Sequence, residues 1–452
     1  MTDCNRRDFV KLSAAAGLGA GLGGQPLWAA GDRGGDLGPA PEEPFAAPPL
    51  ERVRIGYVGV GGMGSAHVRN LLKIEGAEIR AICDIVESKV VRAQKWVVDA
   101  GQPKPAGYSR GERDFERLCA EEELDLVYTA TPWRWHVPVC VAAMKNGKHA
   151  ATEVPAAVTL DECWELVETA EKTKLHCVMM ENCCYGRSEM MVLNMVRKGL
   201  LGEILYAEAG YLHDLRALKF AQSGEALWRT AHSITRNGNL YTTHGLGPVA
   251  QCMNINRGDR FDFMVSMSTP SRGLNLFAAE KFGPDDVRAT RKYALGDINT
   301  SLIQTVKGKM ITLVHDCSSP RPYSRINLVQ GTGGIFQGYP DRIHIEGRSP
   351  AHAWEEAKEY LAEFDHPLWK AVAAAAKAAG GHGGMDYIED YRLIQCLRQG
   401  LPLDMDVYDA AAWSAVSELS ERSVADRSRP VDFPDFTRGR WKAYPPLGII
   451  GG

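Results

Sequence analysis

Three glycines follow an apolar, β-branched run that begins at Val53, and they stand at the spacing G-x-G-x-x-G: Gly59, Gly61 and Gly64. In this pattern the first glycine permits a tight turn, the second lets backbone N–H groups approach a pyrophosphate, and the third allows close packing of helix on strand. The next segment favours a helix, whose N-terminus carries unpaired N–H groups and a positive dipole end. The spacing predicts a phosphate-binding turn; the alternative is an ordinary strand-to-helix turn without a ligand.

A carboxylate lies where a dinucleotide needs one. Asp84 stands 20 residues after Gly64 and ends a second strand-like run, residues 78–83. A carboxylate there accepts hydrogen bonds from both ribose hydroxyls and repels a 2′-phosphate, which favours NAD over NADP. We expect Gly62 and Met63 to complete the pyrophosphate turn.

The elements that position these residues alternate between strand and helix from residue 51 to residue 182. Such alternation predicts an α/β Rossmann domain with a doubly wound parallel sheet. The expected strands are 53–58, 78–83, 124–129, 149–152 and 177–181, and the expected helices are 65–74, 88–99, 115–120, 137–146 and 160–173. The segment between the second and third of these helices is expected to be a loop.

Polar and aromatic residues follow the later strands of this sheet. Ligands bind beyond the carboxyl ends of the strands in such a fold. We therefore expect the nicotinamide half of NAD to be bordered by five residues that follow strands: Trp135, His136, Glu153, Val154 and Asn182. The alternative for the tryptophans of residues 133–136 and for His136 is packing of their loop against the domain edge.

Beyond residue 185 several strand-like runs follow one another without long helices between them. This pattern predicts a C-terminal α+β domain, residues 183–452, with a large, mostly antiparallel sheet. The strand-like runs are 202–211, 261–268, 301–306, 309–316 and 325–331, and helical patterns occur at 189–198, 247–256, 353–362, 386–399 and 410–424. We expect this domain to bind the substrate.

The N-terminus has the features of a twin-arginine signal peptide over residues 1–31. Arg6 and Arg7 precede an aromatic residue, a lysine and a mildly apolar segment that ends in small residues. The prediction is export of the folded protein to the periplasm or the medium; the alternative is a disordered basic tail. Residues 32–50 are rich in Gly, Pro and Ala and indicate a linker.

Composition excludes some classes of protein. The chain has 452 residues, of which 45% are apolar and 24% charged, and its net charge is −4. These values are ordinary for a globular protein and give no sign of a nucleic-acid or membrane-surface role. No apolar run is long enough for a membrane span. The 11 cysteines form no C-x-x-C pair, so we predict neither a disulfide framework nor a metal site.

Several short motifs carry a resemblance to a known family. They are Glu153–Pro155, Glu181–Tyr185, Gly210–Arg216, Trp228–Thr230, Tyr241–Pro248, Arg321–Tyr323 and Gly381–Tyr387. With the Rossmann half, they resemble the glucose-fructose oxidoreductase and inositol dehydrogenase superfamily, and more closely glycoside hydrolase family 109. That family contains exported, NAD-dependent α-N-acetylgalactosaminidases. The resemblance covers roughly residues 51 to 442.

One residue departs from the wider superfamily. Its dehydrogenases usually carry Glu-Lys-Pro, with the lysine beside the substrate hydroxyl, whereas this chain has Val154 there. Valine cannot assist removal of a proton, so a base must come from elsewhere. The candidates are Tyr241, His244 and Tyr185, and we favour His244. The alternative for His244 is a histidine at a helix N-terminus that bonds only to backbone.

The resemblance implies a glycoside hydrolase that recycles NAD. NAD would take a hydride from C3 of a terminal α-N-acetylgalactosamine, the ketone would acidify the C2 proton, elimination would expel the aglycone, water would add and the hydride would return. The residues implied to contact the sugar are Tyr211, Arg229, Tyr241, Thr242, Thr243, His244 and Tyr323. His382 is as compatible with loop structure as with the site.

Other functions stay open at this point. The chain could be an exported sugar dehydrogenase that releases an oxidised sugar, or a non-catalytic sugar- or dinucleotide-binding protein of the envelope. A glycosidase could also act on another hexosamine or anomer, because discrimination between epimers depends on side-chain placement within about an ångström. An exposed face of the second sheet would allow a homodimer.

Overall fold

The computed structural model describes Phe45, residues 47–446 and Ile449. The predicted signal peptide therefore lies outside the described residues, as does the predicted linker except for Phe45 and residues 47–50. Ten cysteines are described, and all ten are free thiols in buried positions. None of the described helices combines the length and apolarity that a membrane span requires.

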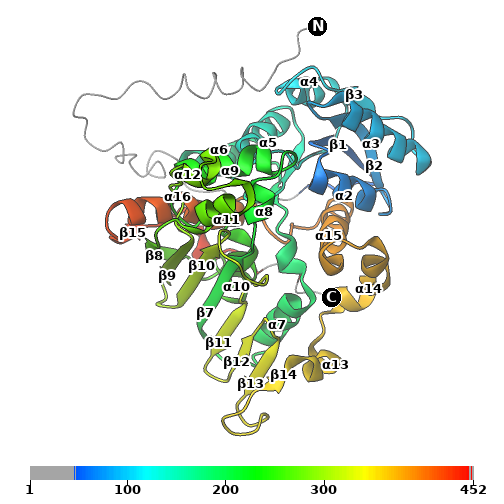
Figure 1. Cartoon of the computed structure of the whole chain (residues 1–452). Helices are drawn as coiled ribbons and strands as arrows, with labels where there is room; N and C mark the ends of the chain where they lie inside the picture. The colour runs from blue at the N-terminus through cyan, green and yellow to red at the C-terminus, as the bar shows by residue number, and fades with distance from the viewer. Residues whose placement is uncertain (1–44, 46, 447–448, 450–452) are drawn as a thin grey trace. The chain divides into compact units, whose positions relative to one another are not determined.

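A six-stranded parallel sheet forms the first half of the described chain (Figure 1). Its strand order is β3-β2-β1-β4-β5-β6, which confirms the predicted doubly wound Rossmann fold. The strands are β1 Val53–Val58, β2 Ala77–Cys83, β3 Ala106–Tyr108, β4 Leu126–Thr129, β5 His149–Thr152 and β6 Cys177–Met179. The helices are α2 Gly62–Leu71, α3 Glu87–Asp99, α4 Asp114–Glu121, α5 His136–Lys145 and α6 Leu160–Thr173.

The prediction of an uninterrupted loop after α3 was wrong at one place. Residues 106–108 form the edge strand β3, which pairs with β2 from Ala81 to Cys83. The three residues Ala-Gly-Tyr show no alternation of apolar and polar side chains, so the strand is defined by the neighbouring edge and not by its own sequence.

A nine-stranded sheet dominates the second half, in the order β14-β13-β12-β11-β7-β10-β9-β8-β15. Only the pair β7–β10 is parallel, which confirms a mostly antiparallel sheet. The strands are β7 Ile204–Leu212, β8 Phe261–Ser268, β9 Ile298–Thr305, β10 Met310–Asp316, β11 Leu328–Gly331, β12 Gly334–Gln337, β13 Arg342–Ile345, β14 Glu355–Glu356 and β15 Val431–Asp432.

The helices of the second half are α7 Arg187–Arg197, α8 Arg216–Lys219, α9 Ala226–Thr235, α10 Thr243–Cys252, α11 Gly273–Phe282, α12 Val287–Thr290, α13 Leu361–Phe364, α14 Pro367–Ala379, α15 Met385–Gln399 and α16 Val407–Ala425. Sequence patterns placed the start of α10 four residues too late, because Pro248 lies inside this helix. They did not predict α14, an alanine-rich helix that begins at Pro367.

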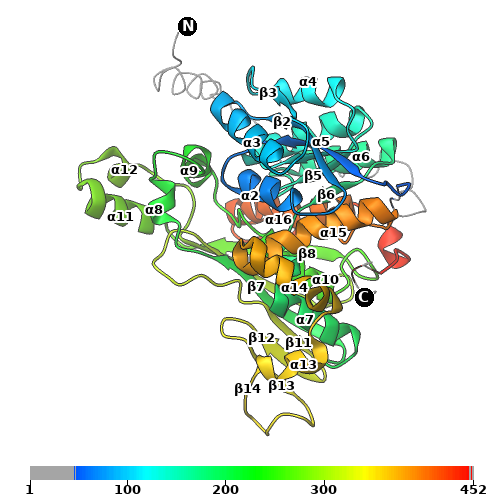
Figure 2. The ribbon, with the colours of Figure 1, turned by 90° about the vertical axis from the view of Figure 1, so that its right-hand side faces the viewer.

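Helices α15 and α16 join the two sheets (Figure 2). Helix α16 packs on α6 of the first half and on β8 of the second, while α15 packs on α2. The C-terminal part of the chain therefore returns to the Rossmann half and supports the helix that follows the glycine turn. The short helix η3 Asn182–Tyr185, which follows β6, packs on α10.

Candidate active site

The glycine turn has the shape that a dinucleotide needs. Gly59 has φ +88°, and a Cβ there would lie 2.8 Å from the carbonyl oxygen of Ala130. A Cβ at Gly64 would lie only 1.9 Å from the carbonyl oxygen of Gly59, whereas one at Gly61 or Gly62 would enter open space. Helix α2 begins with no side-chain cap, so its first N–H groups are available to an anion.

Asp84 is fixed beside this turn. One carboxylate oxygen accepts a hydrogen bond from the backbone N–H of Val60 at 3.0 Å, and the other accepts one from the N–H of Val86 at 2.9 Å. Each oxygen has a second lone pair for a ribose hydroxyl. The turn, the uncapped helix and the carboxylate together fit NAD.

Aromatic and basic side chains from both halves gather into one cluster beyond the strand ends. The ring of Tyr211, on β7, lies 4.4 Å from that of Tyr241 and 5.5 Å from that of His244, on α10. Trp133, from the short helix η2 Trp133–Trp135 after β4, stacks on Tyr241 at 5.6 Å. The guanidinium of Arg229 lies 4.7 Å from the centroid of the Tyr241 ring.

Tyr323 completes the outer side of this cluster. Its ring lies 6.2 Å from that of Tyr211 and 5.0 Å from that of His213, and 37% of the residue is exposed. The exposed ring of Tyr323, beside the buried rings of Tyr211 and Tyr241, offers a stacking face, and the Arg229 guanidinium offers hydrogen-bond donors; both suit a sugar. The structure thus brings together five predicted substrate residues: Tyr211, Arg229, Tyr241, His244 and Tyr323.

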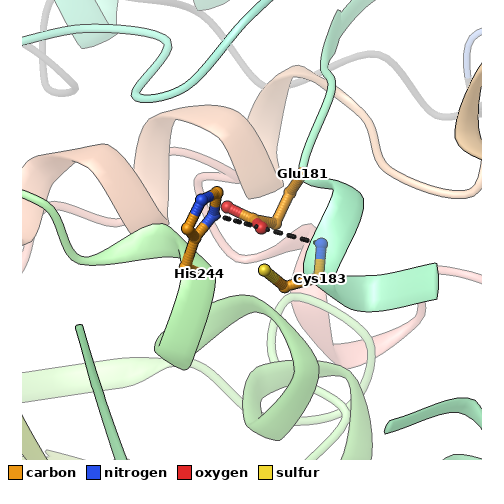
Figure 3. A group of neighbouring side chains, drawn as sticks. All are labelled: Glu181, Cys183 and His244. Carbon is orange, nitrogen blue, oxygen red and sulfur yellow. Dashed lines mark hydrogen bonds and ion pairs between the residues drawn. The ribbon is translucent and has the colours of Figure 1, made fainter. Parts of the chain in front are cut away.

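A buried carboxylate orients His244 (Figure 3). Glu181, directly after β6, is completely buried and accepts a hydrogen bond from His244 Nδ1 at 2.7 Å. Burial by itself would raise the pKa of Glu181, but the charge and hydrogen bond of His244 hold it below its usual value. An ionised Glu181 keeps the proton of a neutral imidazole on Nδ1, so Nε2 presents a lone pair. His244 can therefore act as a general base.

Tyr241 faces that lone pair. Its hydroxyl oxygen lies 3.5 Å from His244 Nε2, at the outer limit of a hydrogen bond. Burial raises the pKa of the Tyr241 hydroxyl well above its ordinary value, although the Arg229 charge acts in the opposite direction. Tyr241 is consequently protonated at neutral pH and can donate a hydrogen bond or a proton.

Glu181, Cys183 and His244 also form a group with metal-ligand chemistry. One donor atom of each lies within 4.8 Å of the others. The carboxylate and the imidazole, however, are bonded directly to each other. Burial raises the pKa of the Cys183 thiol, and a protonated thiol is a poor ligand. The geometry favours a hydrogen-bonded dyad over a metal site.

Three predicted site residues lie apart from the cluster surface. The Tyr185 hydroxyl is buried and donates to Asp404 at 3.0 Å. The Thr242 hydroxyl donates to the carbonyl oxygen of Trp413 at 2.8 Å, and Thr243 is completely buried. These hydroxyls support the second domain's interior, which leaves His244 and Tyr241 as the base candidates in the cluster.

The residues predicted beside the nicotinamide divide into two groups. Trp135 packs edge-on against Phe115, and both ring nitrogens of the buried His136 face backbone carbonyl oxygens. Both therefore support their loop. Glu153, Val154 and Asn182 lie at the carboxyl ends of β5 and β6, with Val154 buried.

Asn182 is held by the second half of the chain. Its side-chain amide donates to Asp386 Oδ1 at 2.7 Å, and His382 Nδ1 lies 2.8 Å from Asp386 Oδ2. The His382 ring remains half-exposed. Its carboxylate partner fixes its orientation at the edge of the site.

A small cavity lined in part by residues of the cluster is too small for a sugar. Its volume is about 20 Å³, little more than one water requires. Lys219, Arg229 and His315 are among its lining residues. The cluster is open to solvent at Tyr323, which is 37% exposed.

Sequence patterns missed two members of the site. Glu181 belongs to the motif Glu181–Tyr185, and a carboxylate at the carboxyl end of a parallel strand is itself a signal of a site. Trp133, not Trp135, reaches the cluster, and nothing in a Trp-Arg-Trp sequence distinguishes the two rings.

Comparisons with known proteins place the fold in a class. The model of an oxidoreductase family with a NAD-binding Rossmann fold matches residues 53–181. A solved levoglucosan dehydrogenase, in complex with NADH and levoglucosan, has the same fold: its TM-score is 0.65 at 17% identity, over 85% of this chain and 100% of that one. The chain is a NAD-binding protein of this class.

The second half defines the family. The model of the glycosyl hydrolase 109 C-terminal domain matches residues 185–443. A glycosyl hydrolase family 109 protein of Solibacter usitatus is 50% identical, over 99% of this chain and 100% of its own. One of Shewanella pealeana is 48% identical, over 99% of each chain. This chain belongs to glycosyl hydrolase family 109 and is a glycosidase that uses NAD.

Proposed function

We propose that the protein removes terminal α-linked N-acetylgalactosamine from a glycoside, using NAD that is restored in each cycle. The observation that carries the proposal is the Glu181–His244 dyad facing Tyr241, in a cluster that adjoins the dinucleotide turn. An ordinary glycosidase needs two accessible carboxyl groups as acid and nucleophile. Glu181 is completely buried and bonded to an imidazole, so it serves neither role.

The chain's own residues divide the work. The backbone of residues 59–64 and the carboxylate of Asp84 hold the dinucleotide, which supplies a reversible hydride acceptor. His244 Nε2 receives a proton from the sugar, and Glu181 stabilises the imidazolium that results. Tyr241 donates a hydrogen bond to the developing oxyanion, and Arg229 stiffens Tyr241 through its ring contact.

A panel of chromogenic α- and β-glycosides, including the N-acetylhexosamines, tests the activity. We expect release of the chromophore from the α-N-acetylgalactosaminide, with protein stripped of NAD inactive until NAD is added back. Preference for another sugar would refute the specificity, and full activity without bound NAD would refute the mechanism.

Isotope exchange at C2 tests the elimination step separately. Substrate deuterated at C2 should lose label to the solvent during turnover in H2O, because proton removal at C2 precedes departure of the aglycone. Complete retention of the label in the product would exclude elimination.

A sugar dehydrogenase, the alternative that the sequence left open, is distinguished by the fate of the cofactor. The absence of a lysine at position 154 argues against it. A dehydrogenase would reduce added NAD in proportion to substrate consumed, whereas the proposed glycosidase would leave the ratio of NAD to NADH constant.

We further propose that the protein is exported through the twin-arginine pathway. The support is the leader sequence with Arg6 and Arg7. Replacement of both arginines by lysine should retain the protein in the cytoplasm, as fractionation of the producing cells would show; unchanged export would contradict this.

We also propose a homodimer through the open face of the nine-stranded sheet. Strand register places Met267, Leu302 and Met310 on one face, and they are 63%, 42% and 43% exposed. An apolar face of this kind is characteristic of an association surface.

A further inference from the structure

A histidine lies between two carboxylates beneath the site. His67, on α2, is three residues beyond Gly64 and fully buried. Its Nδ1 lies 2.9 Å from both oxygens of Asp390, on α15, and its Nε2 lies 2.8 Å from Glu153 Oε1. One ring thus joins the helix of the dinucleotide turn, the loop after β5 and the C-terminal helix α15.

The two contacts define the ring's charge. An ionised carboxylate only accepts hydrogen bonds, so with Asp390 and Glu153 both ionised each ring nitrogen donates and the ring is an imidazolium. Burial raises the pKa of the Asp390 carboxyl, while the charge and hydrogen bond of His67 and the hydrogen bond of Asn70 oppose that rise. Burial alone would lower the pKa of His67, but Asp390 and Glu153 raise it well above its ordinary value. The amide of Asn70 also donates to Asp390, at 3.1 Å.

Other polar groups surround the ring on every side. Tyr128, on β4, has its hydroxyl 3.1 Å from Nδ1. Glu389, on α15, is fully buried, and burial raises its pKa well above the usual range. Tyr57 on β1 and Asp386 on α15 lie in the same buried region. The imidazolium is the cation that balances these acids, so its loss leaves buried carboxylates uncompensated.

Glu153 is the member of this group that reaches the site. Its side chain is 16% exposed, while those of His67 and Asp390 are 1% and 0% exposed. The second oxygen of Glu153 accepts from the backbone N–H of Val154 at 3.0 Å. Both carboxylate oxygens of Glu153 are therefore hydrogen-bonded. Val154 is uncharged, so it cannot supply the positive charge that a lysine would bring.

We propose that His67 is a positioning residue of the reaction, which fixes Glu153 at the site and couples it to the dinucleotide turn and to α15. The expected effect of His67 on kcat rests on the proposed glycosidase function. The positive charge of His67 and its effect on NAD binding do not rest on that function.

Nitrogen NMR of protein labelled with ¹⁵N-histidine tests the charge directly. We expect a histidine with protons on both ring nitrogens at pH 8 whose signals vanish in His67→Gln. A neutral ring at His67 at that pH would overturn the proposal. This measurement needs neither substrate nor turnover.

Kinetics and NAD release test the coupling. In His67→Gln we expect kcat to fall roughly 10- to 100-fold with little change in KM, because Glu153 loses its fixed position. Release of bound NAD should become roughly 5-fold faster or more. The control is His176→Gln. His176 is buried and lies at the amino end of β6, opposite the site, so its replacement should change neither kcat nor the rate of NAD release.

A second variant separates positioning from folding. If His67→Gln is too unstable to purify, the double variant His67→Gln/Asp390→Asn removes one anion together with the cation and should restore folding. It should still show the low kcat and the fast loss of NAD. Normal kcat and normal NAD retention in the double variant would refute the positioning role. If the wild type hydrolyses no glycoside, the NMR spectrum and the NAD release rate still decide the question.

Discussion

At the scale of single residues, the environment of a tyrosine decides its role. Tyr185 and Tyr241 are both buried and were both candidate bases. The hydroxyl of Tyr185 donates to Asp404, which also binds Arg392, whereas the hydroxyl of Tyr241 faces His244. A buried hydroxyl bonded to a structural carboxylate contributes to stability, while one beside a general base can act on a substrate.

Identical substitutions at these two tyrosines should therefore have opposite effects. Tyr241→Phe should lower kcat roughly 10²- to 10⁴-fold with the melting temperature nearly unchanged, because only a proton donor is lost. Tyr185→Phe should leave kcat close to normal and cost about 1–3 kcal/mol of unfolding free energy. Steady-state kinetics and denaturant unfolding measure both. A large loss of kcat in Tyr185→Phe would reverse the assignment.

At the scale of elements, the turn between β1 and α2 combines two kinds of glycine. Gly59 and Gly64 are required by the protein chain itself, because a Cβ at either would contact backbone atoms. Gly61 and Gly62 border open space, so the chain alone does not require them. The absence of a side chain at Gly61 and Gly62 leaves space for the ligand.

Alanine substitutions should separate these two requirements. Gly64→Ala should prevent stable folding, because its Cβ would lie 1.9 Å from a carbonyl oxygen. Gly61→Ala should fold with a normal melting temperature in the absence of NAD but retain less NAD after purification. Calorimetry and the absorbance of bound dinucleotide measure the two effects. Unchanged NAD content in Gly61→Ala would contradict the assignment of the turn.

At the scale of the whole molecule, the second sheet has two different faces. Helices α10 and α16 pack on one face, while the other exposes Met267, Leu302 and Met310. The same two helices carry residues of the site or support it. Association through the open face would leave the aromatic cluster accessible to a glycan.

A charge on the open face should abolish the dimer. Leu302→Asp should convert the protein to a monomer in light scattering, because an unpaired carboxylate would be buried between the two copies. Leu276→Asp is the control, since this leucine is 68% exposed on α11 and outside the sheet. A monomeric wild type, or a dimer that survives Leu302→Asp, would refute the proposed interface.

Local patterns were sufficient for much of the fold. Residues 149–152, 160–173 and 261–268 form the predicted elements at the predicted bounds. In residues 160–173 the helical apolar periodicity and a capping box agree with the final packing. Strand β3 depends on a neighbouring edge and α10 continues through a proline, so neither could be placed from local sequence.

Spacing along the chain was enough to identify the glycine turn, Asp84 and the motif around His244, because their chemistry depends on that spacing. Which side chains meet depends on the three-dimensional packing. Glu181 reaches His244 across 63 residues, and Asp390 reaches His67 across 323 residues. Contacts at such separation arise from the packing of α10 and α15 against the Rossmann half, which no local pattern records.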